Sequence, residues 1–214
     1  MKRIIIHWTA GTNKASKLDR QHYHFIVEGN GNVVAGDLPP EANLSTKDGE
    51  YAAHTLNCNT GSIGVAVAAM AGARERPFTA GRFPITPQQP KALAQLVARL
   101  CEQYDIPVTR QTVLSHAEVQ PTLGIKQKGK WDITWLPGME KPEDPVKTGD
   151  WLRGLVSAEL PKQPKPLAAP GPVSPKGSGL AWLIGTAFLG LSAAFWKWAC
   201  AVPLLAWVFS ICGN

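Results

Sequence analysis

The sequence has few cysteines and few apolar residues at its start. Its four cysteines form no CxxC pair, and 214 residues can build a core without disulfide bonds, which argues against a disulfide framework or a cysteine-rich zinc cluster. They are Cys58, Cys101, Cys200 and Cys212. Only three apolar residues stand between the basic start and His7, far fewer than a secretory signal needs. We therefore expect synthesis in the cytoplasm without a cleaved signal peptide.

Acidic residues are absent from the last part of the chain. All 16 Asp and Glu precede Leu160, so the first 160 residues are close to neutral, whereas the remainder carries four lysines and no acid. A lysine-bearing segment beside an apolar stretch is typical of a contact with an anionic membrane surface rather than with nucleic acid. We expect no nucleic-acid partner.

Three regions differ in composition. Residues 1–158 have the mixed composition of a globular domain, whereas residues 159–179 are rich in Pro, Gly and Lys and predict an extended linker. Residues 180–212 are apolar apart from Lys197 and predict a helical transmembrane segment in a lipid bilayer. One long tilted span and a helical hairpin both fit its length, and a buried helical hairpin of a soluble core is the alternative.

Hydrophobic patterns in the first region predict an α/β fold with a mixed central sheet flanked by helices. "RIIIHW" and "SIGVAVAAM" predict buried strands, and "HYHFIVEGNGNVVAG" predicts a hairpin with a Gly-Asn-Gly turn. Apolar residues at helical spacing in "TPQQPKALAQLVARLCEQYDI" predict an amphipathic helix that ends before Pro107. "TVLSHAEV" predicts a short strand that leads into a loop.

Two histidines close predicted strands and are candidate metal ligands. His7 and His116 each follow an apolar strand, so both side chains can meet at one rim of a mixed sheet, and Asp132 follows a lysine-rich loop. Two imidazoles and one carboxylate make a three-ligand zinc site that leaves a fourth position open, as a catalytic zinc requires. Spacing in the sequence does not by itself establish this site, because His7 lies more than a hundred residues before the other two candidates.

Four motifs together resemble a known family. "IIIHWTAG", "HYHFIVEGNGNVV", "AAHTLNCNTGSIGV" and "SHAEV…GKWD" occur in the order and at about the spacing seen in the N-acetylmuramoyl-L-alanine amidase and peptidoglycan recognition protein family. The resemblance covers residues 1 to about 138 and is nearest to the amidase lysins of bacteriophages. It implies the fold of that family, Zn²⁺ as cofactor and peptidoglycan as partner.

The resemblance also assigns roles by position. It implies zinc ligands at His7, His116 and Asp132, and catalytic roles for Tyr23, beside the metal, and for Lys130 as an oxyanion stabiliser. It further implies that His54 and Asn59 bind substrate. For His54, a structural role in packing its loop is the alternative to substrate binding.

The chain departs from some family members at Ala66. Certain muropeptide-recycling amidases carry a catalytic Glu directly after "SIGV", and the Ala at this position favours the pairing of Tyr23 with Lys130.

Several other residues are expected to take no direct part in catalysis or metal binding. We expect His24 to be a structural residue or a support for the ligands, and His22 a solvated strand-edge residue. Cys58 has no matched base for a nucleophile, and Glu118 is expected to be a solvated loop acid.

The sequence therefore predicts a zinc amidase that cleaves the bond between N-acetylmuramic acid and L-alanine of the stem peptide, in the manner of a phage or prophage endolysin that acts on the cell wall. Three alternatives differ from it. They are a non-catalytic peptidoglycan-binding protein, a recycling amidase, and an antibacterial effector with a membrane tail. Stem-peptide specificity, host, membrane topology and oligomeric state stay open at this point.

Overall fold

The structure is a computed structural model of the chain, and it describes residues 1–161. The membrane segment expected at 180–212 and most of the linker expected at 159–179 lie outside the described residues. Within residues 1–161, no helix combines the length and the apolarity needed to cross a bilayer.

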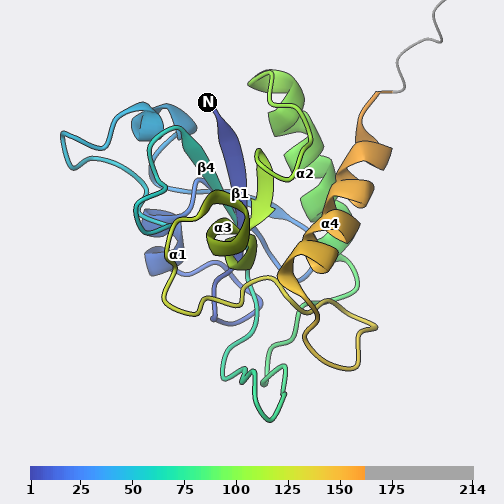
Figure 1. Cartoon of the computed structure of the whole chain (residues 1–214). Helices are drawn as coiled ribbons and strands as arrows, with labels where there is room; N and C mark the ends of the chain where they lie inside the picture. The colour runs from blue at the N-terminus through green and yellow to red at the C-terminus, as the bar shows by residue number, and fades with distance from the viewer. Residues whose placement is uncertain (162–214) are drawn as a thin grey trace, which may run out of the picture. The chain divides into compact units, whose positions relative to one another are not determined.

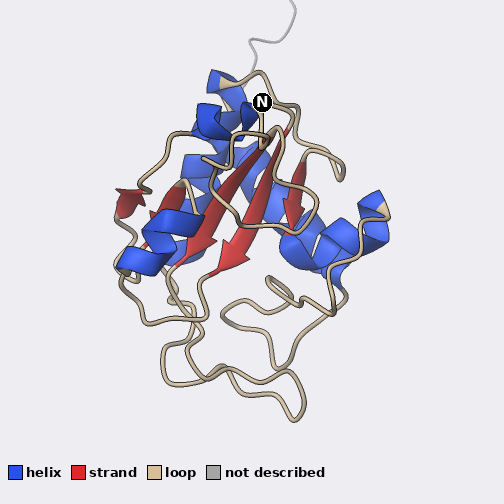
Figure 2. Ribbon diagram, turned by 90° about the vertical axis from the view of Figure 1, so that its left-hand side faces the viewer, coloured by secondary structure: helices blue, strands red, loops and turns tan. Residues whose placement is uncertain are grey.

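A five-stranded mixed sheet forms the centre of the domain (Figure 2). The strand order is β3-β2-β4-β1-β5, and only the β2–β3 hairpin is antiparallel. The strands are β1 (Arg3–Trp8), β2 (Phe25–Val27), β3 (Val33–Ala35), β4 (Ser62–Val67) and β5 (Val113–Ser115). The predicted strands and the hairpin are thus confirmed, together with the mixed sheet.

Strand β1 lies between β4 and β5, and both of its faces are covered. Ile4, Ile5 and Ile6 are at most 1% exposed, and such a continuous apolar run is typical of a parallel strand buried on both sides. Ile4 and Ile6 belong to the main core, whereas Ile5 packs with Cys58 and Val119 in a second, smaller cluster. Side chains alternate along a strand, so His7 projects from the same face of β1 as Ile5.

Helices cover both faces of the sheet. Helices α2 (Gln89–Gln103) and α4 (Pro145–Glu159) lie side by side (Figure 1), and their apolar residues join Ile4 and Ile6 in the main core. Helix α3 (His116–Leu123) contributes Val119 to the cluster on the opposite face. The remaining helices are α1 (Lys17–His22) and the short 3₁₀ helix η1 (Pro40–Leu44). The amphipathic helix predicted from "TPQQPKALAQLVARLCEQYDI" is α2.

Two expectations around His116 are wrong. The strand "TVLS" leads into helix α3 rather than a loop, because Ser115 and Glu118 stand at the N-cap and third helical positions of a capping box, and the backbone N–H of Ser115 donates to Glu118 Oε2 at 2.8 Å. Glu118 is therefore not solvated. It is fully buried and accepts a hydrogen bond from Arg153 of α4 at 2.8 Å. This ion pair joins the start of α3 to α4.

Candidate metal centre

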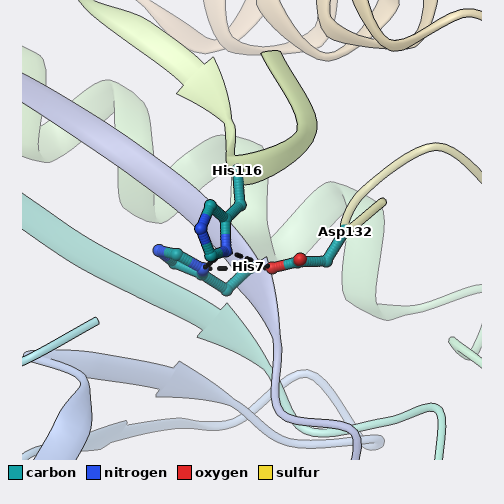
Figure 3. A group of neighbouring side chains, drawn as sticks. All are labelled: His7, His116 and Asp132. Carbon is teal, nitrogen blue, oxygen red and sulfur yellow. Dashed lines mark hydrogen bonds and ion pairs between the residues drawn. The ribbon is translucent and has the colours of Figure 1, made fainter. Parts of the chain in front are cut away.

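The sheet brings two of the three predicted ligands to one edge. In the parallel pair β1–β5, Ile6 lies opposite Ser115, so the next residues, His7 and His116, leave the two strands side by side. Asp132 reaches the same point from the loop that follows α3 (Figure 3). The convergence of both histidines on one rim is thus a consequence of strand register.

The three side chains point their ligand atoms at one another. His7 Nδ1 lies 3.1 Å from both His116 Nδ1 and Asp132 Oδ2, and His116 Nδ1 lies 3.0 Å from Asp132 Oδ2 (Figure 3). One proton can bridge only two of these atoms, so hydrogen bonds alone leave two lone pairs or two N–H groups facing each other. A cation at the centre would satisfy all three atoms at once.

Zinc fits this arrangement. Ligand atoms about 2.0–2.1 Å from a tetrahedral zinc lie roughly 3.3 Å apart, close to the separations of 3.0–3.1 Å found here. His7, His116 and Asp132 form the group of His, Cys, Asp and Glu side chains able to hold a metal within residues 1–161. All three are buried, with 1%, 4% and 7% exposure.

The ionisation states also suit metal binding. Burial lowers the pKa of His7 to about 4, although its hydrogen bond with Asp132 acts in the opposite direction, so the imidazole is neutral. Burial would raise the pKa of Asp132, but its hydrogen bonds with His116 and His7 outweigh that effect and bring the pKa to about 2. Neutral imidazoles and a carboxylate are the forms that ligate zinc.

Gln127, which the sequence analysis did not single out, orients His116. Its side-chain N–H donates to the carbonyl of Leu56 at 2.9 Å, which turns Oε1 toward His116 Nε2, also at 2.9 Å. Since Oε1 can only accept, His116 carries its proton on Nε2 and presents the lone pair of Nδ1 to the metal position. No periodic signal in the sequence identifies this residue, because it lies in a loop.

Both predicted catalytic residues lie near the candidate ligands, Tyr23 against the ring of His7 and Lys130 in the wall of a cleft shared with His116. The ring of Tyr23 is half buried, with its centroid 5.2 Å from that of His7. Burial, followed by the charges of Asp132 and Asp19, raises the pKa of Tyr23, so the phenol keeps its proton. Lys130 is exposed, and its positive charge helps to lower the pKa of His7.

A cleft of about 460 Å³ opens beside the ligands. Its wall includes His116, Lys130 and the two predicted substrate-binding residues, His54 and Asn59. His54 is only 8% exposed and lies against His7, with His54 Nδ1 3.2 Å from His7 Nε2. The side-chain carbonyl of Asn59 accepts from the backbone N–H groups of residues 54 and 55, which fixes the turn that carries His54.

The other residues singled out in the sequence analysis lie outside the candidate ligand set. Ala66 lies directly opposite His7 in the β1–β4 pair, so this neighbouring position carries no carboxylate. His24 is buried and its Nδ1 accepts from the backbone N–H of Gly64 at 2.8 Å. His22 is exposed, as expected, although it ends helix α1 rather than lying on a strand edge. Cys58 is buried in the core, where Arg3 Nη1 donates to its sulfur at 2.9 Å.

Comparisons with known proteins match the chain to a protein family. A family model described as N-acetylmuramoyl-L-alanine amidase matches residues 1–138, and no curated protein matches the chain. Among solved structures, the chain is similar to the Ph2119 endolysin from the Thermus scotoductus bacteriophage Ph2119, with 19% identity, a TM-score of 0.38, and coverage of 56% of this chain and 73% of that chain. It is also similar to the E. coli amidase AmiD in complex with an anhydro-muropeptide substrate, with 25% identity, a TM-score of 0.39, and coverage of 55% and 48%. A third similar structure is that of the Staphylococcus aureus hydrolase AmiA, with 13% identity, a TM-score of 0.44, and coverage of 75% of this chain and 76% of that chain.

Proposed function

Since the chain belongs to the N-acetylmuramoyl-L-alanine amidase family, we propose that it is a zinc-dependent hydrolase of peptidoglycan. The bond cleaved is the amide between the lactyl group of N-acetylmuramic acid and L-alanine of the stem peptide. The observation that carries this proposal is the buried triangle of His7, His116 and Asp132, whose ligand atoms lie 3.0–3.1 Å apart. A peptidoglycan receptor without catalysis has no need for a complete set of three ligands.

Zinc would be held by His7, His116 and Asp132, and it would supply a Lewis acid that polarises the scissile carbonyl and lowers the pKa of water. Lys130 lines the same cleft as His116, and its ammonium group would offset the negative charge that develops on the carbonyl oxygen. Tyr23 keeps its phenolic proton at neutral pH and is available to donate a hydrogen bond to a reacting oxygen.

The muropeptide would occupy the cleft beside these residues. His54 and Asn59 line it together with His116 and Lys130, so a substrate in the cleft has its amide next to the ligand cluster. We further propose that the protein is a lysin of phage or prophage type, because Ala66, opposite His7, stands where certain muropeptide-recycling amidases carry a catalytic Glu, and this favours the pairing of Tyr23 with Lys130.

Digestion of intact sacculi by the full chain tests the proposal. Soluble stem peptides that begin with a free L-alanine amine, identified by mass, are the expected products, and Asp132→Ala should abolish their release. Binding to sacculi without any released peptide would instead support the non-catalytic alternative. Activity against whole bacteria of a competing strain, but none during lysis of the producing cell, would favour an antibacterial effector.

A further inference from the structure

Next to the candidate ligand His7 lies a second buried imidazole, that of His54. His7 Nε2, the nitrogen that faces away from Asp132, lies 3.2 Å from His54 Nδ1 and 3.3 Å from Thr55 Oγ1. Thr55 Oγ1 and His54 Nδ1 are themselves 2.8 Å apart. The nitrogen on the far side of the ring, His54 Nε2, lies 3.4 Å from the backbone carbonyl of Ser62.

The carbonyl of Ser62 sets the direction of this network. A carbonyl oxygen only accepts, so a neutral His54 carries its proton on Nε2 and leaves Nδ1 as an acceptor. His7 Nε2 then donates either directly to His54 Nδ1 or to Thr55 Oγ1, whose hydroxyl donates to His54 Nδ1. In both arrangements His7 bears its proton on Nε2, and its Nδ1 lone pair faces His116 and Asp132.

The surroundings of His54 hold the ring in this orientation. Gly64 of β4 packs against it so closely that a Cβ there would lie 2.5 Å from His54 Cγ. The ring of His24 meets it edge-on, with 5.7 Å between centroids. The ring is only 8% exposed, and burial disfavours the charged imidazolium, so His54 is a neutral ring with a single N–H.

We propose that His54 is a positioning residue that fixes the proton of His7 on Nε2 and thereby makes His7 Nδ1 the zinc-binding atom. The inference rests on the proposed function only in taking zinc as the bound ion. His54 then accepts a hydrogen bond from Nε2 of His7, as Gln127 does from Nε2 of His116. Each candidate histidine ligand thus has its own buried acceptor. This role differs from a direct contact with substrate, which the sequence predicts for His54.

The first test is the tautomer in the full wild-type chain loaded with zinc. Long-range ¹H–¹⁵N correlations of the imidazole rings should show protons on Nε2 of both His7 and His54. A proton on Nδ1 of His54 would overturn the proposal, because the ring would then donate toward His7 rather than accept. This measurement requires no variant and no catalytic activity.

The second test is zinc affinity, measured by competition with a chelator. His54→Phe keeps a ring but loses the acceptor, and we expect zinc to bind about 10- to 100-fold more weakly, as is usual when the partner of a ligating histidine is removed. His54→Gln retains a carbonyl acceptor and should recover most of the affinity. Thr55→Val, which removes only the hydroxyl, serves if His54→Phe does not fold, and it should weaken zinc binding less. The matched control is His22→Phe, at the exposed end of α1.

Each result separates this inference from the proposed function. Unchanged zinc affinity in His54→Phe, with a raised KM, would overturn the positioning role and make His54 a substrate contact. Failure of the wild-type chain to release stem peptides would refute the amidase proposal, yet the affinity and the tautomers would still be measurable. Weaker zinc binding in His54→Phe with wild-type binding in His22→Phe is the result that the structure supports.

Discussion

Gly149 and Gly154 lie in the same helix, and replacing each by alanine separates packing from helix propensity. A Cβ at Gly149 would overlap the carboxylate of Glu118, whereas no atom lies within 4 Å of a Cβ at Gly154. The end of a glutamate side chain can often swing aside. Here it is fully buried and held at 2.8 Å by both the backbone N–H of Ser115 and Arg153 Nη2, so any movement breaks a buried ion pair and the cap of α3.

The magnitude follows from these contacts. Breaking a buried ion pair costs about 3–5 kcal/mol, and alanine gains about 1 kcal/mol over glycine inside a helix. We therefore expect Gly149→Ala to lower the free energy of unfolding by roughly 2–4 kcal/mol, and Gly154→Ala to raise it by up to about 1 kcal/mol. The two variants are compared by urea unfolding of the full chain, monitored by circular dichroism. Equal midpoints for both variants would show that Glu118 is free to move and would refute the argument.

Three further predictions concern the site and the tail. Asp132→Ala should lose most of its zinc by metal analysis, whereas full stoichiometric zinc in this variant would remove Asp132 from the ligand set. Lys130→Ala should keep its zinc and lower kcat by about 100- to 1000-fold, the usual effect of losing an oxyanion donor. Lys126→Ala, which removes the same charge from the same loop outside the cleft, should leave kcat unchanged. The membrane segment expected at 180–212 predicts that the full chain sediments with membranes and resists alkaline carbonate, and release by carbonate would contradict it.

Strand patterns predicted the mixed sheet and the meeting of His7 and His116 at one of its edges. The apolar run before His7 predicts a buried strand, and the shorter run before His116 predicts a second strand, which the structure shows to be its parallel neighbour. Parallel strands end at the same edge, so their last side chains converge even though 109 residues separate them. Asp132 could be assigned only from its motif, because it lies in a loop where no periodicity fixes the direction of a side chain.

Tertiary contacts decided what the sequence patterns missed. Glu118 looks like a loop acid because the run after His116 is short and contains Pro121, yet the capping box starts a helix there and Arg153, distant in sequence, turns the carboxylate inward. The partners of the two histidine ligands, Gln127 and His54, likewise come from loops. Strand register thus determines where the two candidate histidine ligands meet, whereas the loop contacts are proposed to determine which nitrogen each histidine presents. A sequence motif can indicate where the histidines lie. It cannot indicate which ring nitrogen carries the proton, because a tautomer depends on hydrogen-bond acceptors that only the folded chain brings together.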